Sequence, residues 1–131
     1  MAADQAYDYA IIRVVPRVER EEFINVGVIL SCPARGFIEA AIALDEMRLK
    51  ALHAGADVES IRANLQAIAL VCAGGPQAGP IGRLSARERF HWLVAPRSAI
   101  IQTSPVHTGR CTDPAQALQR LLQQMVLPLP A

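Results

Sequence analysis

Lysine is nearly absent from this chain of 131 residues, in which Lys50 is the only one and arginine supplies the other basic side chains. A phosphate-binding loop or a Schiff-base site would therefore have to use Lys50, whose neighbours match neither motif. Aromatic residues make up only 5% of the chain, which leaves few platforms for stacking bases. The formal net charge is +1, so no overall field attracts polyanions. Nucleic-acid binding is therefore not the expected function, although a local basic patch is compatible with these numbers.

Long apolar runs are also missing, and cysteine is scarce. No run approaches the roughly 20 residues that a membrane helix needs. The N-terminal residues include Asp4 and Asp8 and lack the apolar stretch of a secretion signal. The cysteines are odd in number and widely spaced, unlike a disulfide framework; they are Cys32, Cys72 and Cys111. We expect a cytoplasmic protein with no membrane partner and no cofactor, and we expect Cys32 and Cys72 to lie in the core.

Hydrophobic residues are plentiful, at 52% of the chain against 19% charged residues. This composition is opposite to that of disordered proteins, and the length suits one domain with its own core. We therefore expect a single domain over residues 1–131. The end of the chain, residues 125–131, contains Pro128 and Pro130, and we expect it to fray.

Short runs of apolar and β-branched residues predict four strands. The second and third are joined by a short connection with Gly36, which predicts an antiparallel pair. Residues 17–23 predict one helical turn or a structured loop, and Ser104 to Gly109 predicts a loop after the last strand. The expected strands cover residues 9–15, 25–32, 37–44 and 98–103.

Four segments carry helix signals. Asp57 caps the longest helix, which extends to Ala73 with apolar residues at intervals of three and four. Ser85 and Glu88 form a capping-box motif, although the alternation that follows also suits a strand. The remaining two helices begin after capping aspartates and cover residues 46–52, with Met47 and Leu49 or Leu52 facing inward, and 114–125. The glycine-rich residues 74–82 predict no regular structure.

The order of these elements indicates an α+β fold. Strands come first, helices follow, and a late strand and helix close the chain, which argues against alternating βαβ units. We expect a small, mostly antiparallel sheet of about four strands packed against about four helices.

One cluster of polar residues stands out near the end of the first strand. Its arginines suit planar carboxylate or phosphate partners, but the same residues would also satisfy one another in internal ion pairs. Arg13 lies among apolar neighbours and needs a partner, so we expect it to be partly buried and to bond Glu19, Glu21 or Glu22. The candidate binding residues of this cluster are Arg13, Arg17, Arg20, Glu21 and Asn25.

A second set of polar residues lies near the last predicted strand. Arg97, His107 and Thr108 are candidate binding residues there, and we expect His107 to affect binding rather than stability. His107 with Ser104 or Thr108 would be a base and nucleophile pair, but no nucleophile-elbow motif accompanies them, so we assign no catalytic residue. His107 and Cys111 offer only two of the four ligands of a structural zinc site, so we expect no metal.

The segment from Tyr7 to Leu30, together with Arg89 to Gly109 and a terminal Asp-Pro-x-x-x-Leu helix, resembles the bacterial family known as domain of unknown function 3037. The resemblance implies no activity. Members of this family tend to be encoded beside a HipA-like kinase, which implies a possible partner. We therefore expect a non-catalytic interaction or accessory module. The alternative is a small enzyme, a hydrolase or a phosphoryl-handling protein, that uses His107 with Arg97 and the cluster Arg13, Arg17 and Arg20.

Overall fold

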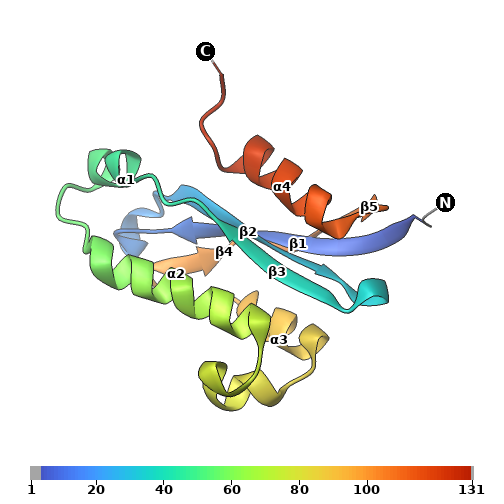
Figure 1. Cartoon of the computed structure of the whole chain (residues 1–131). Helices are drawn as coiled ribbons and strands as arrows, with labels where there is room; N and C mark the ends of the chain where they lie inside the picture. The colour runs from blue at the N-terminus through green and yellow to red at the C-terminus, as the bar shows by residue number, and fades with distance from the viewer. Residues whose placement is uncertain (1–3, 131) are drawn as a thin grey trace.

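The computed structural model describes residues 4–130 and contains one sheet with helices on both faces (Figure 1). Residues 1–3 and Ala131, which we placed in the expected domain and tail, lie outside the described residues. The fold is α+β, as predicted. The strands are β1 (Gln5–Val14), β2 (Ile24–Cys32), β3 (Phe37–Ile42), β4 (Ile101–Thr103) and β5 (His107–Cys111). The α-helices are α1 (Glu46–Leu52), α2 (Val58–Ala73), α3 (Ala86–Leu93) and α4 (Pro114–Met125), and the 3-10 helices are η1 (Val18–Arg20), η2 (Pro33–Arg35) and η3 (Pro76–Arg83).

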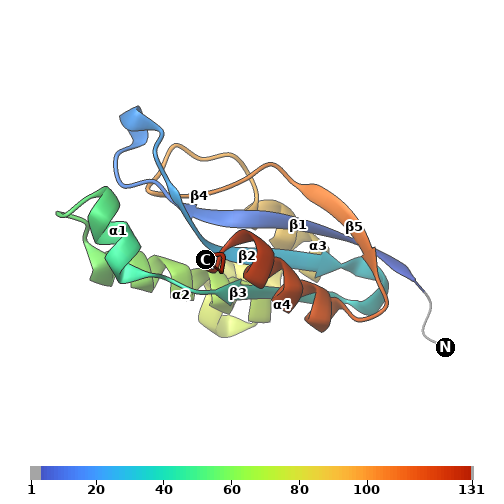
Figure 2. The ribbon, with the colours of Figure 1, turned by 90° about the horizontal axis from the view of Figure 1, so that it is seen from above.

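The longest strand, β1, is the centre of the sheet. It pairs antiparallel with β2. Strand β2 pairs in turn with β3, and this second antiparallel pair is the one that the sequence predicted. Gly36 in the β2–β3 connection has φ 59°, a conformation that glycine adopts without strain. The other side of β1 pairs with two short strands, β4 along its C-terminal end and β5 along its N-terminal end. The edge opposite β3 is therefore built from two strands, and Figure 2 shows both.

Each face of the sheet has its own core, because successive side chains of a strand point to opposite faces. Ile12 and Val14 pack with α2 and α3, whereas Tyr7 and Ile11 pack with α4. Figure 1 shows α4 on one side of the sheet and α2 and α3 on the other. Val126, just after α4, is only 4% exposed and belongs to the α4 core. Ordered packing therefore extends into the segment for which we expected fraying.

The predicted helices form with the predicted caps. Asp45 and Asp57 accept hydrogen bonds at the starts of α1 and α2, and Ser85 and Glu88 form the capping box of α3. The inward-facing residue of α1 is Leu49, which is fully buried, whereas the prediction that Met47 faces inward was wrong. A helix of two turns presents only one side to the core, and Met47 is 85% exposed on another.

Asp57 makes the stability of α2 sensitive to acid. Hydrogen bonds from the Ser60 side chain and backbone N–H lower the pKa of Asp57 below its ordinary value of 3.8. A lowered folded-state pKa stabilises the fold above the unfolded pKa, and this contribution is lost as pH falls through the folded pKa. We expect Asp57→Asn, which still caps the helix but does not titrate, to remove part of the stability loss below about pH 4. Urea unfolding from pH 3 to 7 measures this, and identical pH profiles for both proteins would contradict it.

One segment that we expected to be a loop forms a strand. His107 to Cys111 forms β5 instead of continuing the loop from Ser104, and β1 begins at Gln5 because β5 supplies hydrogen-bonding partners for residues 5–9. Local propensity misses such a strand, since threonine, glycine and arginine next to each other carry no apolar alternation. The fourth strand, by contrast, is limited to residues 101–103.

The glycine-rich segment after α2 forms η3, in which two short 3-10 turns meet at a kink at Gly79, whose φ of 69° is not helical. The N–H of Gly75 donates to the carbonyl oxygen of Gly82 at 3.1 Å, which closes the segment on itself. A Cβ at Gly82 would lie 1.9 Å from the carbonyl oxygen of Gly75, so only glycine fits this closure. No helix in the described part of the chain is long and apolar enough to cross a membrane.

Candidate functional site

Two arginines from distant parts of the chain line one open cavity of about 490 Å³. Arg13 comes from the C-terminal end of β1, and Arg97 comes from the connection between α3 and β4. The cavity lies where these segments meet the connection between β1 and β2. We call it the arginine cavity, and its lining includes Arg13, Val18, Glu21, Phe23, Arg97 and Gln102.

Arg13 is placed by an irregularity in the sheet. The pairing of β1 with β2 shifts between Ile12 and Arg13, so that Asn25 rather than Val26 lies opposite Arg13. On the other side of β1, Arg13 lies opposite Gln102 of β4. Bulges of this kind redirect side chains at functional sites. Polar residues on both neighbouring strands therefore flank an arginine that would otherwise lie in an apolar surface.

The guanidinium of Arg13 stacks on an aromatic ring instead of pairing with a carboxylate. Its Cζ lies 4.2 Å from the centre of the Phe23 ring, a cation–π contact. Its Nε is buried and makes no hydrogen bond. Arg13 is partly buried, as predicted, but the prediction of a bond to Glu19, Glu21 or Glu22 was wrong. Among residues 4–130 no carboxylate forms an ion pair with it.

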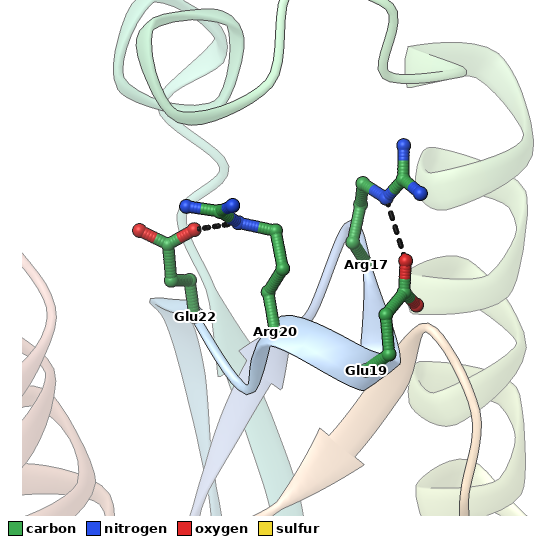
Figure 3. A network of polar contacts seen from close by, with 4 residues as sticks. All are labelled: Arg17, Glu19, Arg20 and Glu22. Carbon is green, nitrogen blue, oxygen red and sulfur yellow. Dashed lines mark hydrogen bonds and ion pairs between the residues drawn. The ribbon is translucent and has the colours of Figure 1, made fainter.

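Two of the three expected carboxylates, Glu19 and Glu22, lie beside nearer arginines in and around η1 and pair with them. Arg17 pairs with Glu19 at 2.7 Å and Arg20 pairs with Glu22 at 2.5 Å. Figure 3 shows both pairs projecting from η1, away from the strands. A backbone hydrogen bond, and to a smaller extent the hydrogen bond from Arg17, lowers the pKa of Glu19. Arg17 and Arg20 are thus joined in exposed internal ion pairs, outside the lining of the arginine cavity.

Arg97 is also held by an aromatic residue. Its Cζ lies 4.3 Å from the centre of the Trp92 ring, and its Nη2 donates to the Trp92 carbonyl oxygen at 2.6 Å. No carboxylate within the described chain pairs with it. These two contacts fix the direction of the guanidinium while leaving its other N–H groups available. Arg97 is exposed, so a ligand reaches it without displacing core residues.

The charge of the cavity limits what it binds. Arg13 and Arg97 supply two positive charges, and Glu21 supplies one negative charge to the same lining. Glu21 has φ 58°, an uncommon conformation for a residue with a side chain. A surplus of one positive charge suits a single carboxylate better than a multiply charged phosphate. Gln102 adds an amide to the lining, although its Nε2 already donates to Ala99.

The other predicted binding residues lie outside this cavity. Asn25 donates from Nδ2 to the carbonyl oxygen of Met125 at 3.0 Å and joins β2 to the end of α4. His107 is on β5, and its ring lies 5.4 Å from that of Tyr9. Thr108 lies opposite Asp8 on β1. His107 therefore stands on a strand and not on the loop that we predicted, and the structure does not bring it together with Arg97.

Ser104 has a structural position between β4 and β5. It is 4% exposed, and its hydroxyl accepts a hydrogen bond from the Ile11 N–H at 2.8 Å and donates to the Pro105 carbonyl oxygen at 2.9 Å. The side chain thereby replaces a backbone partner of β1 where the edge changes strands. The Ser104 hydroxyl is thus directed at the Pro105 carbonyl oxygen and not at the His107 ring.

The cysteines carry no sign of reactivity. All three are buried, as predicted for Cys32 and Cys72. Burial raises the pKa of Cys72 to about 12, and burial also raises the pKa of Cys111. Both thiols therefore stay protonated near neutral pH and are weak nucleophiles. Within residues 4–130 there is no group of three or more His, Cys, Asp or Glu residues that would hold a metal ion.

Sequence reasoning identified Arg13, Glu21 and Arg97 but missed the aromatic residues that hold the two arginines. Phe23 and Trp92 lie in segments whose patterns predicted a helical turn or a helix, and neither was assigned as a site residue. In the folded protein both are exposed large hydrophobic residues, at 42% and 40%, and both lie beside arginines. The sequence shows only that aromatic residues are few, because exposure is known only once the chain is folded.

Comparison with known proteins identifies a family but no activity. No curated protein and no solved structure matches the chain significantly. The family model described as "Protein of unknown function (DUF3037)" matches residues 9–126, which is most of the chain. The match includes β1 from Tyr9 onward, the arginine cavity and α4. The chain therefore belongs to the DUF3037 family, as the resemblance of its motifs implied.

Proposed function

We propose that this protein is a non-catalytic accessory module that binds another protein in the bacterial cytoplasm through the arginine cavity. The observation that carries the proposal is that two guanidiniums face one open cavity, and neither pairs with a carboxylate among residues 4–130. An arginine that is not paired with an internal carboxylate is available for the bidentate hydrogen bonds that carboxylates accept.

The ligand that suits this cavity is an acidic side chain of a partner protein. Arginine stacked on an aromatic ring is already oriented, so less entropy is lost when it binds. Arg, Trp and Phe are also residue types enriched in protein interfaces. The resemblance to family members encoded beside a HipA-like kinase makes that kinase the candidate partner.

The test is direct binding to a HipA-like kinase from the same organism, measured by isothermal titration calorimetry. Arg13→Ala and Arg97→Ala should each weaken binding by about tenfold or more, the loss expected when a charged hydrogen bond is removed. Arg13→Lys should also weaken it, because lysine keeps the charge but lacks the planar fork. Binding should weaken as salt is added.

Arg120→Ala is the matched control, since Arg120 is exposed on α4 and makes no hydrogen bond or ion pair within the described chain. It should bind as the unaltered protein does. Thermal unfolding of each variant separates lost binding from lost folding. Unchanged affinity in folded Arg13→Ala and Arg97→Ala proteins would place the interface elsewhere, and absence of binding by the unaltered protein would exclude this kinase as the partner.

A further inference from the structure

A second cavity adjoins the arginine cavity at Arg97. It has a volume of about 390 Å³ and lies between α2, the end of α3 and β4. Its lining is mostly apolar, with Asn64 and Arg97 as its polar members, and includes Ala67, Ile68, Val71, Trp92, Ile100 and Ile101. We call it the apolar cavity. Arg97 lines both cavities, so a ligand bound in one lies next to the other.

The two cavities open on opposite faces of the sheet at the β4 edge. Ile101 lines the apolar cavity and its neighbour Gln102 lines the arginine cavity, and adjacent residues of a strand point to opposite faces. The chain between α3 and β4, which contains Arg97, runs along this outer edge (Figure 2). A ligand that crosses the edge beside Arg97 therefore reaches an apolar surface on one face and two guanidiniums on the other.

The apolar cavity leaves large hydrophobic side chains in contact with water. Ile100 is 48% exposed and Trp92 is 40% exposed, and both line it. The cavity is open, so it would cover only part of a small molecule, whereas small-molecule sites enclose most of their ligand. A protein segment that passes over the edge covers an open cavity completely. Tryptophan and arginine side by side are also the residues that contribute most to protein interfaces.

We infer that the apolar cavity receives a hydrophobic side chain from the same partner segment whose carboxylate binds in the arginine cavity. The recognised segment thus carries a hydrophobic residue close to an acidic one. This inference rests on the proposed function and adds the sequence chemistry of the partner. Charge complementarity favours this occupant, because the apolar lining ends at Arg97, a cation with no carboxylate partner among residues 4–130 that attracts an acidic neighbour of the inserted side chain.

The test uses terminally blocked peptides that contain one leucine and one glutamate, separated by one, two or three glycines. Trp92 is the only tryptophan in the chain, so its fluorescence and its indole N–H resonance report occupancy of the apolar cavity without ambiguity. Backbone resonances of Arg13 and Gln102 report the arginine cavity. At millimolar concentration we expect at least one spacing to shift both groups of resonances of the ¹⁵N-labelled protein with the same dissociation constant.

Two altered peptides separate this inference from the proposed function. A peptide with serine in place of leucine should lose the Trp92 response and bind more weakly, and a peptide with glutamine in place of glutamate should lose the Arg13 response. If the serine peptide binds as well as the leucine peptide, with shifts only around Arg13, the inference is overturned while the proposed function stands. If no peptide shifts either group, both are overturned.

A matched pair of variants tests the cavity itself. Ala67 is exposed on α2 and lines the apolar cavity, whereas Ala69 is exposed on the same helix and lines a different hollow beside β3. Glutamine has a helix propensity only slightly below that of alanine, so either position tolerates the substitution. Ala67→Gln should weaken binding of the leucine peptide about tenfold and Ala69→Gln should leave it unchanged. Equal affinities, or tighter binding of octanoate than of any peptide at Trp92, would overturn the inference.

Discussion

Replacing Phe90 with alanine should lower the free energy of unfolding by about 3–5 kcal/mol. Phe90 lies on α3, is 1% exposed, and belongs to the core between the sheet, α2 and α3. Removing its ring leaves a cavity that the short helix closes poorly, because α3 is held at its start by the Ser85 capping box and at Arg89 by bonds to α2.

Chemical denaturation of Phe90→Ala and Phe90→Leu measures this effect. Phe90→Leu should lose clearly less stability, since it fills most of the space, and His91→Ala should lose little because His91 is exposed. A loss below about 1 kcal/mol for Phe90→Ala would show that the ring is not a principal part of this core.

Leu65→Ala should destabilise the protein by about 2–5 kcal/mol through the same mechanism on the longest helix. Leu65 is 2% exposed and faces the sheet from the middle of α2, where it packs in one core with Ile61 and Cys72. Its neighbour Gln66 is exposed, so Gln66→Ala is the matched control and should change stability only slightly. Equal shifts of the denaturation midpoint for the two variants would mean that the buried face of α2 has been assigned wrongly.

The helices could be predicted because their signals are local. Asp57 and Ser85 are N-caps that act within one turn, and the apolar spacing of α2 from Ile61 to Cys72 identifies its buried face. The hairpin of β2 and β3 was predictable for the same reason, since Gly36 allows the turn and the strands follow directly. The short strand β5 was not, because it exists through pairing with residues 5–9 of β1, about a hundred positions earlier in the chain.

The candidate site shows the same division. Arg13 could be identified as an arginine on an apolar strand that needs a partner. Its actual contact, the Phe23 ring at 4.2 Å, depends on the β-bulge after Ile12 and on the path of the β1–β2 connection. Arg13 contacts the ring and not a carboxylate because Glu19 and Glu22 already pair with Arg17 and Arg20 around η1.

The helices, their caps, the apolar face of α2, the α+β class and the family could all be predicted from sequence alone, because each depends on neighbours within a few residues or on an ordered set of motifs. Which arginines share a cavity depends instead on how distant segments of the chain pack together. Arg13 and Arg97 are 84 residues apart and meet because β4 pairs with the end of β1. Long-range pairing of this kind depends on the register of the whole sheet, which no local pattern encodes.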